Sequence, residues 1–193
     1  MEERIEDAKI QLTKKGEEQA KELGNRINNI ILDRKINKEE CLVLVSPYDR
    51  ARKTFEIANE KVNFNLENVF ILNNLREQTF AAFDFINEET KQTKFKREYE
   101  EYKRNTFKYF KQQYLGESPA NVYDRTFGLL FFISKFLNAK ESTKSIFIFA
   151  HGCVNKCLIM NVLNLLPEYF NNSGMADNCS IINIKNGKWN GYI

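Results

Sequence analysis

The chain has 193 residues and a net charge of +3, with lysine and arginine interleaved among aspartate and glutamate, so residues 1–193 suit a single domain and a nucleic-acid partner is not expected. Its polar first residues, MEERIEDAK, predict no signal peptide, and no apolar run approaches the roughly 20 residues of a membrane helix. We therefore expect a cytoplasmic protein without a membrane partner.

Helical and strand patterns alternate along the chain. Apolar residues at three-to-four spacing predict a helix over 12–31, with Thr13 as its N-cap. The apolar, β-branched run CLVLVS (41–46) is typical of a buried strand. The following segment, SPYDRARKTFEIANEK, predicts a second helix with Ser46 as its N-cap and Pro47 in its first turn.

The remaining segments continue this alternation. A long helical region lies between Gln78 and Ser145, and its apolar part, 122–137, is expected to pack against the sheet. Strands separated by helices indicate an α/β fold, here a three-layer α/β/α sandwich with a mainly parallel sheet. Further strands are predicted at 68–75, 145–150 and 179–185, with KWNGYI a last edge strand after the turn KNGK.

The sequence holds four cysteines, Cys41, Cys153, Cys157 and Cys179. Without a secretory signal they are expected to be reduced thiols. Cys153 and Cys157 are four residues apart and close to His151, but this spacing is not that of a zinc site. We therefore expect buried thiols and neither a metal nor another cofactor.

Candidate functional residues follow the predicted strands, where open α/β sheets bind ligands. Arg50 lies in the first turn of a helix, where its charge opposes the helix dipole. A bound anion would account for that position; a solvated surface arginine is the alternative. Glu77 follows the third strand, either as a catalytic carboxylic acid or as a structural carboxylate paired with Arg76 or a lysine.

His151 is the sole histidine, and it directly follows the run SIFIFA. Gly152 beside it permits close backbone approach, although a lone histidine is more often a core residue. An arginine, a glutamate and a histidine at three strand ends together indicate phosphate-ester chemistry. Arginine and protonated histidine hold phosphoryl oxygens, and a carboxylic acid protonates the leaving oxygen.

These segments resemble the histidine phosphatase superfamily, also called the phosphoglycerate mutase-like fold. The resemblance runs from Asp7 to the C-terminus and is closest to plant and fungal phosphoglycerate mutase-like proteins, which behave more like phosphatases than mutases. The segments that carry it are LTKKGEEQAKELG, SPYDRARKTFEIA, LREQTF, GESPANVYDR, FIFAHG and NCSIINI.

The resemblance implies phosphomonoester hydrolysis through phosphohistidine, without a cofactor. It assigns phosphate binding to Arg50, proton donation to Glu77 and the second family histidine to His151. Ser46 and Gly152, with Arg50 and His151, are expected to contact the substrate. That substrate would be a phosphorylated small molecule or a phosphopeptide.

The family's nucleophile, a histidine in an R-H-G motif on a first strand upstream of Leu12, has no counterpart in the sequence. We expect a shortened version of an active enzyme; a pseudophosphatase that binds a phosphorylated ligand and a nonfunctional fragment are the alternatives. Loss of that strand should leave CLVLVS and SIFIFA without hydrogen-bond partners. The chain alone is then expected to aggregate through its open sheet.

Three further departures concern the site. Asn121 replaces an aspartate of the G-E-S segment, Phe80-Ala81 stands where F-G is common, and Asp84-Phe85 stands where Glu-Gly is frequent. The last two pairs are expected to shape the mouth of the pocket. The natural substrate and the oligomeric state are left open by the sequence.

Overall fold

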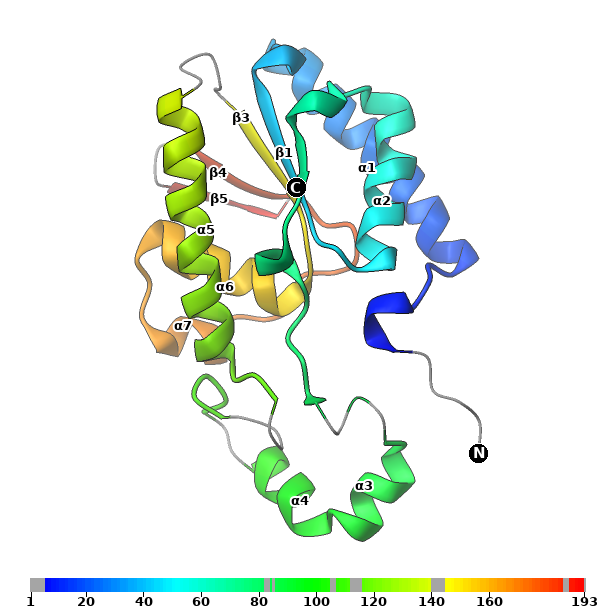
Figure 1. The fold of residues 1–193 in the computed structure, drawn as a ribbon, viewed down its shortest axis with the longest axis vertical. Helices are drawn as coiled ribbons and strands as arrows, with labels where there is room; N and C mark the ends of the chain where they lie inside the picture. The colour runs from blue at the N-terminus through cyan, green and yellow to red at the C-terminus, as the bar shows by residue number, and fades with distance from the viewer. Residues whose placement is uncertain are drawn as a thin grey trace.

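A computed structural model describes residues 6–81, 84, 86–104, 107–111, 116–139, 145–185 and 188–192. A parallel sheet lies between two layers of helices (Figure 1). Its helices and strands include, in chain order, η1 (Asp7–Lys9), α1 (Lys14–Asp33), η2 (Lys38–Glu40), β1 (Cys41–Val45), α2 (Asp49–Val62), η3 (Leu66–Asn68), β2 (Val69–Ile71), η4 (Asn73–Leu75), α3 (Glu88–Lys94), α4 (Lys96–Arg104), α5 (Pro119–Ala139), β3 (Ser145–Phe149), α6 (Gly152–Leu163), α7 (Pro167–Asn172), β4 (Ile182–Lys185) and β5 (Lys188–Tyr192).

The three-stranded sheet has the order β2-β1-β3, and both neighbours of β1 run parallel to it. All five residues of β1 are buried, and successive side chains point to opposite faces. Cys41, Val43 and Val45 pack with α1 and α2 on one face, whereas Leu42 and Leu44 pack with α5 and α6 on the other. The predicted three-layer α/β/α sandwich with a parallel sheet is confirmed.

The two helices of the first layer approach closely at Gly24. A Cβ atom at this position would lie 2.7 Å from the carbonyl oxygen of Ala58 and 2.9 Å from its Cα. The N-terminus of α1 is capped as predicted, because the Thr13 hydroxyl accepts the N–H of Gly16 at 3.1 Å.

The start of α2 differs from the prediction. The helix begins at Asp49 with Tyr48 as its N-cap residue, so Ser46 is not the cap and Pro47 lies outside the first turn. The Ser46 hydroxyl instead accepts the N–H of Tyr48 at 3.3 Å and contacts the His151 ring at 2.7 Å. This second contact is with a distant part of the chain, which helix-start patterns do not report.

Two strands are shorter than predicted, for local reasons. β2 ends at Ile71 because the chain turns into the 3₁₀ helix η4. β4 starts only at Ile182, after Cys179 with its left-handed φ of 60°, a conformation that does not extend a strand. β4 and β5 form the expected hairpin as a separate antiparallel sheet, in which Lys185 pairs with Lys188. The two residues of the predicted KNGK turn between them lie outside the described residues.

The segments CLVLVS and SIFIFA, which form β1 and β3, were expected to lack hydrogen-bond partners. This expectation is wrong for β1, and for β3 it holds only along one edge. β1 is paired along both edges. Among the described residues, no strand pairs with the second edge of β3. Figure 1 shows α3 and α4 far from the sheet, below the lower end of α5. In the described part of the chain, no helix is long and apolar enough to cross a membrane.

Candidate active site

Ser46 and His151 meet at the carboxyl ends of β1 and β3, and the Tyr48 ring packs against both the His151 ring and the guanidinium of Arg50. Ser46 follows β1 and forms a backbone hydrogen bond with Phe149, the last residue of β3 (2.9 Å). His151 is the residue immediately before α6, and Arg50 is the second residue of α2. Parallel strands end at one edge of a sheet, which is why residues 105 positions apart in the sequence come into contact.

His151 is buried, with 8% of its surface exposed. Its Nε2 lies 2.7 Å from the Ser46 hydroxyl, and its ring packs edge-on against Tyr48, with the ring centroids 5.2 Å apart. Burial lowers the pKa of His151 to about 3, and the positive charges of Arg50 and Arg125 act in the same direction. The imidazole is therefore neutral near pH 7.

Arg50 is not the solvated surface arginine of the alternative interpretation. Its Nη1 donates to the backbone oxygen of Asp7 at 2.7 Å and to Oδ1 of the same residue at 3.0 Å. Its Nη2 donates to Oδ2 at 3.1 Å, which completes a bidentate ion pair. The guanidinium also lies over the Tyr48 ring, 5.0 Å from the centroid. The anion that Arg50 holds in this structure is thus a carboxylate of its own chain.

Glu77 lies in the loop after η4, and burial raises the pKa of its carboxyl. The N–H of Gln78, which donates to Oε1 at 2.8 Å, and the charge of Arg50 partly oppose that rise in pKa. The proposed structural pairing with Arg76 is wrong, because Arg76 instead binds Glu117 at 2.7 Å. Glu77 is therefore a partly buried carboxyl whose pKa is raised by burial.

A carboxylate that sequence reasoning missed holds the Glu77 loop in place. The Glu117 carboxylate accepts hydrogen bonds from Nε of Arg125 at 2.9 Å and from Nη2 of Arg125 at 3.1 Å. It also accepts hydrogen bonds from Arg76 and from the N–H of Thr79 at 3.2 Å. Arg125 also donates to the backbone oxygen of Glu77 at 3.3 Å. Glu117 and Arg125 both lie in the segment GESPANVYDR, but the sequence of that segment does not predict that they bind the distant Glu77 loop.

All three departures from the family pattern have structural consequences. Asn121 forms a reciprocal cap with Ser118 at the start of α5: the Ser118 hydroxyl accepts the N–H of Asn121 at 3.2 Å, and Oδ1 of Asn121 accepts the N–H of Ser118 at 2.8 Å. Ala81 has a φ of 47°, in the left-handed region where glycine is unstrained. Asp84 accepts the N–H of Phe80 at 2.8 Å and so closes this turn. The position of Phe85 lies outside the described residues.

The start of α6 holds the last predicted contact residue and two cysteines. A Cβ atom on Gly152 would overlap the methyl group of Met175, so only glycine fits here without a shift. Cys153 and Cys157 are buried as predicted, and hydrogen bonding between them and burial raise the pKa of the Cys153 thiol. A protonated thiol is a poor metal ligand and nucleophile. The described residues contain no group of three side chains suited to a metal ion.

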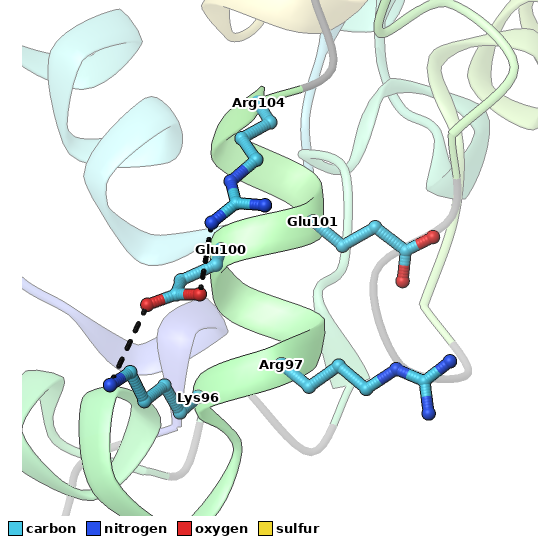
Figure 2. A pocket seen from close by; sticks show the side chains of 5 residues that line it. All are labelled: Lys96, Arg97, Glu100, Glu101 and Arg104. Atoms are coloured by element: carbon cyan, nitrogen blue, oxygen red, sulfur yellow. Dashed lines mark hydrogen bonds and ion pairs between the residues drawn. The ribbon is translucent and has the colours of Figure 1, made fainter.

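A hollow of about 470 Å³ lies elsewhere, along α4 (Figure 2). Along this helix, Glu100 pairs with Lys96 at 3.9 Å and with Arg104 at 3.4 Å. Figure 2 shows Arg97 and Glu101 extending away from these pairs. All five lining residues come from one exposed helix, and a ligand site needs polar groups that converge from several elements. The candidate site remains the one at the strand ends.

The sequence and the fold both match known proteins. The sequence model of the histidine phosphatase superfamily (branch 1) matches residues 4–191. Phosphoglycerate mutase-like protein AT74 of Arabidopsis thaliana is 29% identical over an alignment of 182 positions, which covers 89% of this chain and 55% of that protein. The chain thus spans about half the length of this curated relative.

Solved structures share the fold at low sequence identity. The alpha-ribazole phosphatase from Shigella flexneri has a TM-score of 0.72 and 21% identity, with 95% of this chain and 83% of that chain covered. A mycobacterial glucosyl-3-phosphoglycerate phosphatase in complex with inorganic phosphate has a TM-score of 0.68 and 18% identity, with 93% and 81% covered. At these identities the two structures establish the fold alone.

Proposed function

Since this chain belongs to the histidine phosphatase superfamily (branch 1), we propose that Arg50, His151 and Ser46 bind the phosphoryl group of a phosphate monoester. The observation that carries this proposal is the contact between Ser46 and His151 beside Tyr48, whose ring packs against both His151 and the guanidinium of Arg50. The Ser46 hydroxyl lies 2.7 Å from His151, and the charge of Arg50 lowers the pKa of that histidine.

Each group has a part in holding the anion. The guanidinium of Arg50 matches two phosphoryl oxygens at once. The first N–H groups of α6 lack partners within their own helix, and no side chain caps them at His151, so they favour a negative group there. The phosphate raises the pKa of His151, because its negative charge stabilises the imidazolium.

Glu77 has the properties of the general acid. Burial raises its pKa, so the carboxyl holds its proton to higher pH than an exposed glutamate does. In a form of the protein that supplies the nucleophile histidine, a bond from that histidine to phosphorus would form as the bond to the ester oxygen breaks, and the Glu77 proton would pass to the leaving alkoxide. The Glu77 carboxylate would then take a proton from the water that attacks the phosphohistidine and releases phosphate.

In the family the phosphohistidine forms on the first histidine, whereas His151 matches the second. His151 is the sole histidine of the 193 residues, so the nucleophile has no counterpart. His151 is buried and contacts Ser46 through Nε2. We therefore propose that this chain binds phosphate monoesters and forms no phosphoenzyme by itself. Loss of the nucleophile in other hydrolases slows turnover about 10⁶-fold. The whole-protein activity would be that of a phosphomonoesterase of this family.

The test combines inorganic phosphate with an aryl phosphate. We expect phosphate to raise the melting temperature of the wild-type chain without measurable release of the aryl alcohol. Arg50→Met should abolish the shift, whereas Arg52→Met, which removes an exposed arginine from the same helix, should not. Hydrolysis that is lost in Arg50→Ala and His151→Ala would identify a complete phosphatase. Neither a shift nor hydrolysis would contradict the proposed function.

A further inference from the structure

The segment around Asp7 occupies the arginine that we assign to phosphate. Asp7 accepts three hydrogen bonds from Arg50, at 2.7, 3.0 and 3.1 Å, with its backbone oxygen and both carboxylate oxygens. Both terminal nitrogens of the guanidinium take part. An arginine has five N–H groups. Three hydrogen bonds from Arg50 already go to Asp7. A carboxylate and a phosphoryl group present the same pair of oxygens to this fork.

A second contact fixes the same segment to the start of α2. The amide of Gln11 donates to Oδ2 of Asp49 at 2.7 Å and to the backbone oxygen of Lys9 at 3.0 Å. Residues 7–11 therefore lie along the N-terminus of α2 and place a negative charge beside Arg50. We refer to residues 7–11 as the strap.

The strap lacks the apolar anchoring that would make it permanent. Residues 7–9 include no buried residue, and Ile10 is 42% exposed. The Arg50 and Asp7 side chains are 24% and 33% exposed, respectively. A segment held by partly exposed polar contacts opens at low free energy compared with the core. A stronger anion can therefore displace it.

We propose that the strap is an intramolecular competitor for the phosphoryl site, in which the Asp7 carboxylate must leave Arg50 before a phosphate monoester binds. This inference rests on the proposed function and adds its regulation. The affinity for phosphate is reduced by the fraction of time for which Arg50 is released. If that fraction is about one tenth, removal of the competitor tightens binding about tenfold.

The alternative role for Asp7 is to orient Arg50 for the ligand. The two roles predict opposite effects of the same substitution. Loss of a competitor strengthens phosphate binding, whereas loss of an orienting partner weakens it. Asp7→Asn removes the charge of Asp7 and keeps its shape, which makes it the variant of choice.

Glu6→Gln is the matched control. Glu6 is adjacent in the sequence, carries the same charge and pairs with Lys9 at 3.1 Å, with both side chains largely in solvent. The two variants change the net charge equally and at nearly the same place. Only Asp7→Asn removes the ion pair with Arg50, so long-range electrostatics cannot account for a difference between the two variants.

The experiment is a calorimetric titration with inorganic phosphate of the wild-type chain and both variants. Hydrogen exchange of the Ile10 amide, which donates to the Asp7 backbone oxygen at 3.3 Å, is followed in the wild type. We expect about tenfold tighter binding in Asp7→Asn and a change under about twofold in Glu6→Gln. Phosphate should also accelerate the exchange of the Ile10 amide, because the strap leaves.

Equal or weaker binding in Asp7→Asn than in Glu6→Gln would overturn the competition and leave the proposed function intact. Unchanged exchange at Ile10 when the wild type is saturated with phosphate would do the same without any variant. Binding by Asp7→Asn alone would support both proposals. An absence of binding in all three proteins would overturn the proposed function and the competition with it.

Discussion

His151 contributes to stability in a way that depends on its protonation. The ring is neutral in its buried position beside Ser46, and its pKa is lowered from 6.5 to about 3. In the unfolded chain the pKa returns to the ordinary value, so the unfolded state binds more protons between these limits. The free energy of unfolding is therefore highest above pH 6.5 and falls as the pH is lowered toward 3.

We expect the free energy of unfolding to fall by about 1.4 kcal/mol per pH unit below about pH 6. His151→Gln should remove this slope, because glutamine does not titrate. Urea unfolding of both proteins at several pH values between 7 and 4 measures the difference. The raised pKa of Glu77 has the opposite effect, because its contribution to the free energy of unfolding falls as the pH rises. Both proteins keep Glu77, so this contribution cancels when their pH curves are compared. Parallel pH curves would contradict this account of His151.

Glu117 stabilises the loop that carries Glu77. Its carboxylate is 14% exposed and pairs with Arg125, whose side chain is 12% exposed. Removing one partner of such a pair leaves a buried charge uncompensated, so Glu117→Gln should lower the free energy of unfolding by about 3 kcal/mol. Glu56→Gln is the control, since Glu56 meets Lys53 at 3.7 Å in solvent and should change it by less than about 0.5 kcal/mol. Equal losses for the two variants in urea unfolding would contradict this stabilising role of Glu117.

At this scale the sequence offered candidate site residues but not their interaction partners. Arg50, Glu77 and His151 could be picked out because they follow strands and match motif positions. Arg76 is adjacent to Glu77, yet its partner is Glu117, 41 residues away. Likewise Asp7 meets Arg50 across 43 residues. Long-range pairing depends on how the elements pack, and charge alone leaves many partners open.

Among the helices, the contact between α1 and α2 depends on Gly24. A Cβ atom there would meet the backbone of Ala58 at 2.7 Å, and backbone atoms do not give way as side chains do. Gly24→Ala is therefore expected to lower the free energy of unfolding by about 2 kcal/mol or more. Urea unfolding measures this change.

Gly128 provides the matched control within α5. The nearest atom to an added Cβ would be Nδ2 of Asn74 at 3.7 Å, an ordinary contact distance. Gly128→Ala should then stabilise the protein by about 0.5–1 kcal/mol, because alanine loses less backbone entropy in a helix. The same substitution thus has opposite signs at the two positions. Stabilisation by Gly24→Ala would contradict the close helix approach.

Elements with a strong apolar period were predictable from the sequence, and their ends less so. The helix over 12–31, the strand over 41–46 and the strand over 145–150 match α1, β1 and β3 within a few residues. The start of α2 was misplaced because Ser46, a good cap by type, binds His151 instead. Tertiary contacts overrode the local preference at that position.

On the scale of the whole molecule, the second edge of β3 is the weak point of the sheet. No described strand pairs with it, and Ile146, Phe147 and Ile148 are only partly buried. An unpaired, apolar strand edge is a template for pairing with another chain. We expect the 193-residue chain to associate as its concentration rises, which light scattering coupled to size exclusion measures. A monomer that melts cooperatively at every concentration would contradict this expectation.

The central claim, that phosphate binds between Arg50 and His151, can be tested most directly by NMR of the one histidine ring in the chain. We predict that inorganic phosphate shifts the ring Cδ2–H and Cε1–H signals of His151 saturably toward their imidazolium positions. Arg50→Met should abolish the shifts and Arg52→Met should preserve them. Ring signals that do not move with phosphate, or that move equally in Arg50→Met, would contradict the claim.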